Sequence, residues 1–310
     1  MTSTVRYEVE VAVPYRLDLT VSVLRRLSTN VVDVFTPQGQ YVRALSGFHD
    51  PVVARVAQPR PGALAVSIEG RAGEHPSALA IVRRMLGVDR ELSHFERGAR
   101  RFPWLSPLAV RMRGVKPPRY PTLWEACVNA IIFQQVSLLA ASSISRRMIM
   151  ALAEPIERGS VELRAFPSIG SFERATDGVM RAAGLSTNKL AALRRVADAI
   201  LSGALDEASL EERSSPDAAA LLCRIKGIGP WTATVILLRG LGRLDVFPMN
   251  DSSVARNLAF VAGSVSPGID RVLTALRPQQ GMLYYHLLLA RLDARGDVGR
   301  ASVACGVSGR

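Results

Sequence analysis

The sequence predicts a mostly α-helical protein with an amino-terminal α+β domain, and three observations support this fold class. The chain has 310 residues, of which 48% are hydrophobic and 21% are charged, which is enough for about two domains with their own cores. Its first quarter alternates polar and apolar residues as strands do, whereas most of the remainder has apolar residues at helical spacing. A segment rich in proline and cations separates the two patterns.

The amino-terminal domain, residues 1–115, is expected to be an antiparallel sheet followed by helices. Alternating, valine-rich stretches predict strands at residues 7–13, 30–45 and 63–70. The last of these strands follows the breaker sequence QPRPG at 58–62. Apolar side chains three to four positions apart predict two helices lying against the sheet, at 75–88 and 90–102.

The linker is placed at residues 116–121, within the stretch 113–121, because prolines and adjacent cations resist helix formation there. No convincing strand pattern follows it, so the domain 122–310 is expected to be all-α.

Three helix signals follow the linker. Thr122 and Glu125 have the spacing of a capping box, in which the two side chains satisfy each other's backbone N–H groups. One long apolar helix is expected over 126–152. Another is expected to begin at a Ser186 cap and to end at Gly203, where a left-handed residue would stop it.

Composition narrows the classes of function. The net charge of +12 favours a polyanionic partner such as nucleic acid. No run approaches the roughly 18 to 20 apolar residues of a membrane span, and the opening residues do not form a signal-type core. We therefore expect a cytoplasmic protein without a membrane partner. The cysteines and histidines are too scattered for a zinc or iron–sulfur site, so no metal is expected; the cysteines are Cys127, Cys223 and Cys305.

Two helices flank a glycine-containing turn in the segment 214–251. Ser215, with Pro216 and Asp217 after it, predicts a helix start, and this helix runs to about Ile225. A second apolar helix is expected from Trp231 to about Arg239, closed by Gly240.

The turn between them, Gly227-Ile228-Gly229-Pro230, makes the unit a helix–hairpin–helix. Glycine allows backbone conformations that are closed to other residues, so successive N–H groups at the start of the second helix can point outward together. Such a nest suits one phosphate of a DNA strand. The alternative is an ordinary helical hairpin with glycine in its turn.

With these residues the sequence resembles the helix–hairpin–helix superfamily of base-excision DNA glycosylases, and within it the 3-methyladenine DNA glycosylase II branch. The motifs that carry the resemblance are KGIGPWTA at 226–233, LDVFPMNDSSVAR at 244–256, AIIFQQVS at 130–137 and GLSTNKLAALRRVADAI at 184–200. The resemblance covers residues 122 to about 296 and extends more loosely to the amino-terminal domain. It implies the helix–hairpin–helix DNA glycosylase architecture.

The resemblance implies that Asp251 is the catalytic carboxylate. It would stabilise a sugar transition state with oxocarbenium character while the bond to a damaged base breaks. The structural alternative is that Asp251, or Asn250 before it, caps a helix, and the two roles are compatible. Asp245 lies too early relative to the family pattern.

Trp231 stands where bifunctional members of the family carry a lysine that forms a Schiff base with the sugar. The chain has only three lysines, and none replaces it by position: Lys116, Lys189 and Lys226. The resemblance therefore implies monofunctional hydrolysis that leaves an abasic site. The missing four-cysteine cluster also opposes the endonuclease III and adenine-glycosylase branches.

A base pocket and a DNA-binding surface are implied as well. The pocket residues would be Trp231, Phe133, Tyr284 and Tyr285, whose π faces suit a purine made cationic by alkylation. Core packing of one or more of Tyr284, Tyr285 and His286 is the alternative. The DNA contacts would be Gln135, Lys226, Gly227, Ile228, Gly229 and Thr232. Gln135 would fill the gap left by the flipped base. The alternative is that Gln135 is an exposed surface residue without this role.

The sequence departs from well-known members at Val235, Ser252 and Gln279, where an aromatic residue is common, and this leaves the substrate range open. The expected partner is damaged double-stranded DNA, bound by a monomer without a cofactor. Whether a monovalent cation sits at the hairpin stays open. Two alternative functions remain. One is an oxidised-purine (8-oxoguanine-type) glycosylase, and the presence of Trp231 at the lysine position argues against it. The other is a non-catalytic helix–hairpin–helix module, and the presence of Asp251 argues against it.

Overall fold

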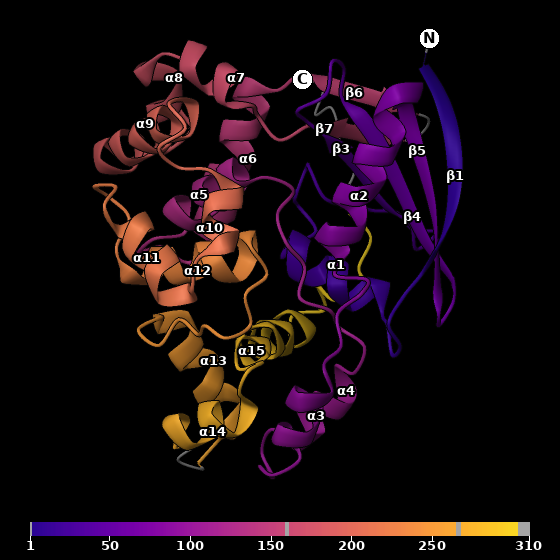
Figure 1. Cartoon of the computed structure of the whole chain (residues 1–310), viewed down its shortest axis with the longest axis vertical. Coiled ribbons are helices and arrows are strands. Elements are labelled where there is room, and N and C mark those ends of the chain that lie inside the picture. Colours follow the sequence, from indigo (N-terminus) through magenta and orange to yellow (C-terminus); the bar gives the residue numbers. More distant parts are fainter. Residues whose placement is uncertain (1, 159–160, 265–267, 303–310) are drawn as a thin grey trace.

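The computed structural model describes residues 2–158, 161–264 and 268–302. Figure 1 shows a sheet on one side of the molecule and a larger group of helices on the other, with α1 and α15 between them. Cys305 and the last residues of the expected helical domain lie outside the described ranges.

The amino-terminal sheet is antiparallel, as predicted. Its strands are β1 (Thr2–Glu10), β2 (Val34–Phe35), β3 (Tyr41–Leu45), β4 (Val52–Arg60) and β5 (Ala63–Arg71). They lie in the order β1-β5-β4-β3-β2. The expected breaker at 58–62 is partly wrong, because β4 runs through Arg60 and pairs it with Ala63, leaving only Pro61 and Gly62 in the turn.

Most helices of this region were missed or misplaced from the sequence. Helix α1 (Leu17–Arg25) was not expected at all. Helix α2 (His75–Leu86) follows the short 3-10 helix Ala72–Glu74 and packs on β4 and β5, as expected. Helix α3 (Ser93–Ala99), in contrast, packs on α14 (Ile269–Leu276) rather than on the sheet.

The close approach of α3 to α14 occurs at Gly98. A Cβ at this position would lie only 2.5 Å from the carbonyl oxygen of Ala275. The next helix, α4 (Ser106–Arg111), contacts α15 (Gly281–Asp293). The sequence between the sheet and the linker therefore contributes to the core of the carboxy-terminal helices.

The stretch 113–121 is neither helix nor strand, as expected of a linker, but most of it is buried. Its backbone bonds to both parts of the molecule: the Arg119 N–H donates to Met85 O at 2.9 Å, and the Tyr120 N–H donates to Arg239 O at 2.8 Å. The chain thus passes between the two parts instead of crossing an exposed gap.

Helix α5 (Leu123–Ile132) lies at the centre of the helical part and packs on α9, α12 and α6. The other helices of this part are α6 (Leu138–Leu152), α7 (Ile169–Arg174), α8 (Asp177–Ala182), α9 (Thr187–Leu201), α10 (Glu207–Glu212), α11 (Ser215–Cys223), α12 (Pro230–Gly240) and α13 (Ser252–Ala262). The predicted ends of α9 are confirmed, because Ser186 caps it and Gly203, with a φ of 75°, follows it.

The single helix expected over 126–152 is wrong. The chain leaves α5 after Ile132, and α6 begins after the cap Ser137, whose hydroxyl accepts from the Ala140 N–H at 3.2 Å. Gln135, with a φ of 55°, lies in the loop between the two helices. The apolar pattern continues across this loop because Phe133 and Val136 still pack on the core.

The expectation of an all-α carboxy-terminal domain is also wrong. β6 (Pro155–Arg158) and β7 (Val161–Arg164) form a two-stranded antiparallel sheet. Leu163 packs with Val42 and Val53 of the large sheet, and the Arg164 N–H donates to Val31 O at 3.2 Å. Strands of four residues are too short to show a clear alternation in the sequence.

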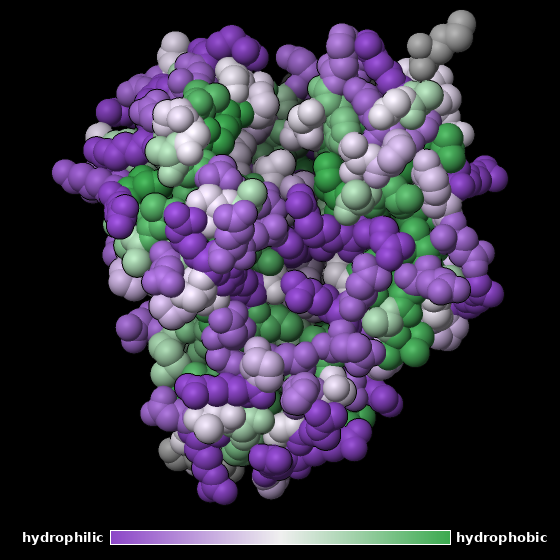
Figure 2. Space-filling view, in the orientation of Figure 1, coloured by the Kyte–Doolittle hydropathy of each residue, from purple (hydrophilic) through white to green (hydrophobic). Residues whose placement is uncertain are grey.

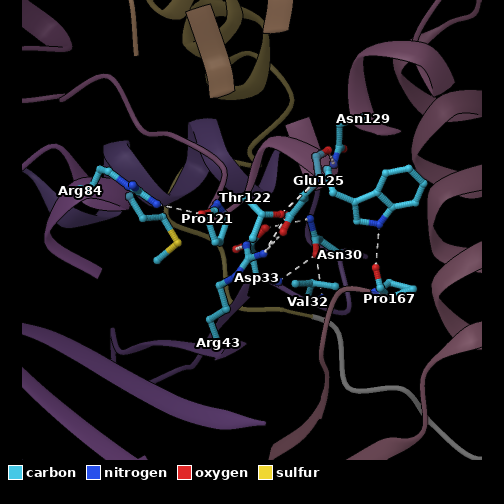
Figure 3. A network of polar contacts seen from close by, with 12 residues as sticks. Asn30, Val32, Asp33, Arg43, Arg84, Pro121, Thr122, Glu125, Asn129 and Pro167 are labelled. Atoms are coloured by element: carbon cyan, nitrogen blue, oxygen red, sulfur yellow. Dashed lines mark hydrogen bonds and ion pairs between the residues drawn. The ribbon is translucent and has the colours of Figure 1, made fainter. Parts of the chain in front are cut away.

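A buried ionic cluster joins the sheet to α5 (Figure 3). Arg43 of β3 donates to Asp33 Oδ1 at 2.5 Å and to Glu125 Oε1 at 2.7 Å, and all three side chains are 4% exposed or less. Thr122 caps α5 as predicted, but the Glu125 carboxylate is used by Arg43 instead of completing a capping box. Removing one partner of such a cluster costs about 3 to 5 kcal/mol, because it leaves an uncompensated buried charge.

The cluster contains two carboxylates and one guanidinium. Burial raises the pKa of Glu125 to about 7, with Arg43 opposing this rise and Asp33 adding to it. In the unfolded chain this carboxyl titrates near its ordinary value of 4.5. Between pH 4.5 and about pH 7, Glu125 binds its proton more tightly in the folded state than in the unfolded state. The free energy of unfolding therefore decreases as the pH rises through this range.

We expect Glu125→Gln to flatten the pH dependence of stability. The free energy of unfolding of the wild type should fall from pH 5 to pH 8 by on the order of 1 to 3 kcal/mol more than that of the variant. Urea unfolding at four pH values measures this, with the exposed Glu154 replaced by Gln as the matched control. Parallel curves for the wild type and Glu125→Gln would contradict the raised pKa.

Candidate active site

The helix–hairpin–helix predicted at 214–240 is present. Helix α11 is capped by Ser214, one residue before the predicted Ser215, and the Ser214 hydroxyl accepts from the Asp217 N–H at 3.3 Å. Helix α12 begins at Pro230 with Gly229 as its cap residue. The turn between the helices is exposed at Lys226, Gly227 and Gly229.

The two glycines of the turn have different reasons to be glycine. Gly227 has a φ of 109°, and a Cβ there would lie 2.4 Å from the Cβ of Ala192 in α9. Gly229 has a φ of −94°, which any residue adopts, and a Cβ there would meet nothing within 4 Å. The expectation that both glycines need a special backbone conformation is therefore wrong for Gly229, whose open side faces away from the protein.

Two residues predicted to contact DNA have buried side chains. Ile228 is 4% exposed, and its N–H donates to Ile225 O at 2.9 Å. Thr232 is 3% exposed, and its hydroxyl accepts from Gln134 Nε2 at 2.8 Å. Their side chains hold the hairpin in place instead of facing outward.

The loop between α5 and α6 supports the hairpin. Gln134 Nε2 also donates to Gly227 O at 2.9 Å, so one amide of this loop binds both sides of the turn. The neighbouring Gln135 is exposed and has a positive φ. Of the two adjacent glutamines, Gln134 is therefore an internal brace, and Gln135 projects from the surface beside the hairpin.

Asp251 lies at the start of α13 and is held by three donors. Its Oδ1 accepts from the N–H groups of Ser253 at 2.7 Å and Val254 at 3.1 Å, so Asp251 and not Asn250 is the helix cap. Its Oδ2 accepts from Nε1 of Trp231 at 2.9 Å. The Asp251 carboxylate and the Trp231 ring are both half-buried, whereas Asp245 is exposed. The hairpin thus places an indole directly against a carboxylate that lies twenty positions later in the chain.

The four residues of the expected aromatic pocket differ in their exposure. Trp231, Phe133 and Tyr284 are half-buried. The expectation for Tyr285 is wrong: its side chain is fully buried, and its hydroxyl donates to Leu238 O at 3.0 Å, so it belongs to the core. His286 is buried against Phe95 in the same way.

Gln279 does not take the place of an aromatic wall. Its side-chain oxygen accepts from the Phe95 N–H at 2.9 Å, and its Nε2 donates to Glu91 O, so it supports the start of α3.

One contact was not anticipated from the sequence. The guanidinium carbon of Arg26 lies 3.7 Å from the centroid of the Phe133 ring, and Arg26 is buried next to Tyr120, Tyr284 and Arg239. Because α1 was not expected, no sequence signal placed this arginine beside Phe133.

The face of the molecule drawn in Figure 2 is hydrophilic over most of its area and is hollowed between the sheet-bearing part and the helices. In the residues that the structure describes, no group of three histidine, cysteine or acidic residues is arranged to hold a metal ion. No described helix combines the length and apolarity needed to cross a membrane.

Comparison with known proteins finds a similar fold in solved DNA glycosylase structures. The structure is similar to that of the 3-methyladenine DNA glycosylase from Archaeoglobus fulgidus, with a TM-score of 0.77, 22% identity, and coverage of 93% of this chain and 99% of that one. The chain has the helix–hairpin–helix DNA glycosylase fold. The fold predicted from the sequence is therefore confirmed.

Sequence comparisons agree with the predicted resemblance to 3-methyladenine DNA glycosylases. The chain is 27% identical over 177 residues to a DNA-3-methyladenine glycosylase of Bacillus subtilis, covering 57% of this chain and 58% of the relative. It is 33% identical over 178 residues to a probable bifunctional transcriptional activator/DNA repair enzyme AlkA of Mycobacterium tuberculosis, covering 56% of this chain and 34% of the relative. The match thus spans about half or less of these relatives' length, and no family model matches the chain.

The different roles of the two hairpin glycines predict different costs of substitution. Gly227→Ala should lower the free energy of unfolding by about 1 kcal/mol or more, because of its positive φ and the contact with Ala192. Gly229→Ala should change it by no more than about 0.5 kcal/mol. Urea unfolding of the two variants side by side checks this, and equal losses of stability would show that the distinction is wrong.

Proposed function

We propose that the protein is a monofunctional DNA glycosylase of base-excision repair, which flips an alkylated, 3-methyladenine-type purine out of damaged double-stranded DNA and releases it by hydrolysis. The observation that carries the proposal is the contact between Asp251 and Trp231. It places a fixed carboxylate at the edge of the Trp231 indole at the start of α12, where the hairpin is exposed, and leaves the π faces of the ring unused by this contact. The names of the relatives support the alkylated-base class.

The proposed reaction breaks the bond between the base nitrogen and C1′ of deoxyribose. The bonding electrons leave with the base, C1′ becomes oxocarbenium-like, and a water oxygen then adds to C1′ and loses a proton. Asp251 stabilises the positive sugar by position. Its Oδ2 accepts only one hydrogen bond in the described structure, so a lone pair stays available to face the sugar.

The leaving group explains why no strong general acid is needed. An alkylated purine such as 3-methyladenine is cationic before the bond breaks, and it leaves as a neutral base. The face of Trp231 is suited to a cationic ring. Selectivity would then come from the lower cost of unstacking a damaged pair and from the fit of the extruded base.

The hairpin and the basic surface would hold the DNA. The start of α12 presents the open side of Gly229, where a phosphate oxygen can approach the helix amino terminus without meeting a side chain. Lys226 is exposed on the same turn, and the chain carries a net charge of +12. Gln135, projecting beside the hairpin, would occupy the gap left by the flipped nucleotide. We propose that a monomer performs these steps.

An oxidised-purine glycosylase of the lyase type would need an amine where Trp231 stands, and a DNA-binding module would not need the carboxylate that Trp231 and α13 hold in place. A base-release assay on methylated, deaminated, etheno-modified and oxidised duplexes separates these alternatives.

We expect Asp251→Asn to retain binding to damaged DNA and to lose single-turnover base release by about 100-fold or more, since the charge acts mainly in the transition state. Asparagine caps helices as well as aspartate does, so α13 should stay folded. Asp206→Asn, at the cap of α10, is the matched control. A variant that releases base at nearly the wild-type rate would reduce Asp251 to a helix cap.

We also expect the reaction to leave intact strands that carry alkali-labile abasic sites. Borohydride should trap no covalent complex, because Trp231 replaces the Schiff-base lysine. Denaturing gels with and without alkali, together with a trapping assay, measure both. Efficient trapping, especially if Lys226→Ala abolishes it, would overturn the monofunctional assignment.

A further inference from the structure

The edge of the Trp231 ring carries one polar group, and this group is bound to Asp251. The indole Nε1–H can only donate, and it donates to Asp251 Oδ2 at 2.9 Å. The ring is half-buried and packs against the core of the helical part. Because the hydrogen bond uses the edge of the ring, it is separate from any stacking on the faces. An effect of the edge can therefore be distinguished from an effect of the faces.

The indole is mounted on a rigid support. Trp231 is the second residue of α12, whose cap residue is Gly229. The next residue, Thr232, is 3% exposed, and its hydroxyl accepts from Gln134 Nε2 at 2.8 Å. The backbone that carries the indole is thus held from both sides, and the donor Nε1–H has a defined position relative to the hairpin.

The helix cap alone does not fix the orientation of the Asp251 carboxylate. Both backbone donors of α13 bind the same oxygen, Oδ1, from Ser253 at 2.7 Å and from Val254 at 3.1 Å. The terminal torsion of aspartate is broad, so Oδ2 can swing while Oδ1 stays bound. The bond from Trp231 is the only one to Oδ2 in the described parts of the chain, and it restricts this swing.

The partner of Oδ2 is neutral, which preserves the charge of the carboxylate. Among the described residues no lysine or arginine forms an ion pair with Asp251, although the chain contains 39 of them. Arg256, which is nearest in sequence, donates to Ser253 Oγ at 3.2 Å instead. A cation at Oδ2 would compensate the negative charge and weaken its attraction for a positive sugar. An indole N–H orients the oxygen without this compensation.

We propose that Trp231 is a positioning residue, whose Nε1–H directs Asp251 Oδ2 toward C1′ of the flipped nucleotide, independently of any contact between its faces and the base. This inference rests on the proposed glycosylase function. It assigns the hydrogen bond to the rate of bond breaking, because a carboxylate that swings away from the sugar stabilises the oxocarbenium-like state less. Affinity for a neutral abasic duplex should depend little on it.

A duplex without a base separates the edge of the ring from its faces. In the probe duplex a pyrrolidine ring stands in for one sugar, and its protonated nitrogen mimics the positive sugar. The reference duplex carries a neutral tetrahydrofuran ring at the same place. We expect the wild type to bind the pyrrolidine duplex about tenfold more tightly or better, and Asp251→Asn to lose this preference. The ratio of the two dissociation constants is independent of the folded fraction of a variant.

Trp231→Phe and Trp231→His form a matched pair of variants. Both lose the second ring of the indole, but imidazole carries Nε2 at the ring position that Nε1 has in indole, so only histidine keeps a donor. At about pH 8, where imidazole is mostly neutral, Trp231→His should keep the preference for pyrrolidine within about threefold. Trp231→Phe should reduce this preference about fivefold or more, and single-turnover release of 3-methyladenine about tenfold or more.

Trp124→Phe is the control for losing an indole donor elsewhere. The Trp124 ring is buried, and its Nε1 donates to Pro167 O at 3.0 Å. This variant should keep the wild-type preference for pyrrolidine.

A wild-type preference in Trp231→Phe would show that the hydrogen bond does not position the carboxylate. Equal losses in Trp231→Phe and Trp231→His would assign Trp231 to packing or stacking, and would also overturn the inference. A wild type that binds both abasic duplexes equally would instead contradict the electrostatic role of Asp251, and one that releases no base from any damaged duplex would contradict the proposed function.

Discussion

The contact between Arg43, Asp33 and Glu125 is the constraint on which the arrangement of the site depends. It fixes α5 to the sheet, and the contact lies in the first turn of that helix. Because the three charges are buried, they tolerate little displacement without losing their compensation. The orientation of α5 then determines where its other end, and the loop after Ile132, meets the hairpin.

From this helix the site is assembled by a short series of hydrogen bonds. Gln134 fixes the turn at Gly227 and the start of α12 at Thr232, and Trp231 of the same helix turn reaches Asp251. The carboxylate is also bound by the backbone of α13. Each bond joins segments that are distant in sequence, so the position of Asp251 reflects the packing of α5, α12 and α13 together. A pre-organised site of this kind requires rigid supporting elements.

The sequence was sufficient where a local signal controls the structure. Glycine at 227, the Ser186 cap and the strand alternation at 63–70 each determine a few neighbouring residues, and these predictions were confirmed. The strand expected over 30–45 is instead the two short strands β2 and β3, and β4 was not predicted. Helix α1 was missed because its residues from Leu17 to Val23 alternate between apolar and polar side chains, a pattern that is typical of a strand. The break after Ile132 had a usable signal in the Ser137 cap, but the apolar pattern continues past it. Tyr285 could not be separated from Tyr284 by sequence, because only packing decides which ring is enclosed.

The boundary between the two parts, at residues 113–121, is a buried segment and not an exposed linker. It marks a change in composition, yet its backbone bonds to Met85 on one side and Arg239 on the other, and Arg119 also forms ion pairs with Glu207 and Glu211. A protease that cleaves mobile interdomain connections should find no entry point here in the native state. The sheet-bearing part therefore packs against the helical part as one structural unit. Expressing either part alone would expose apolar surface and unpaired backbone groups.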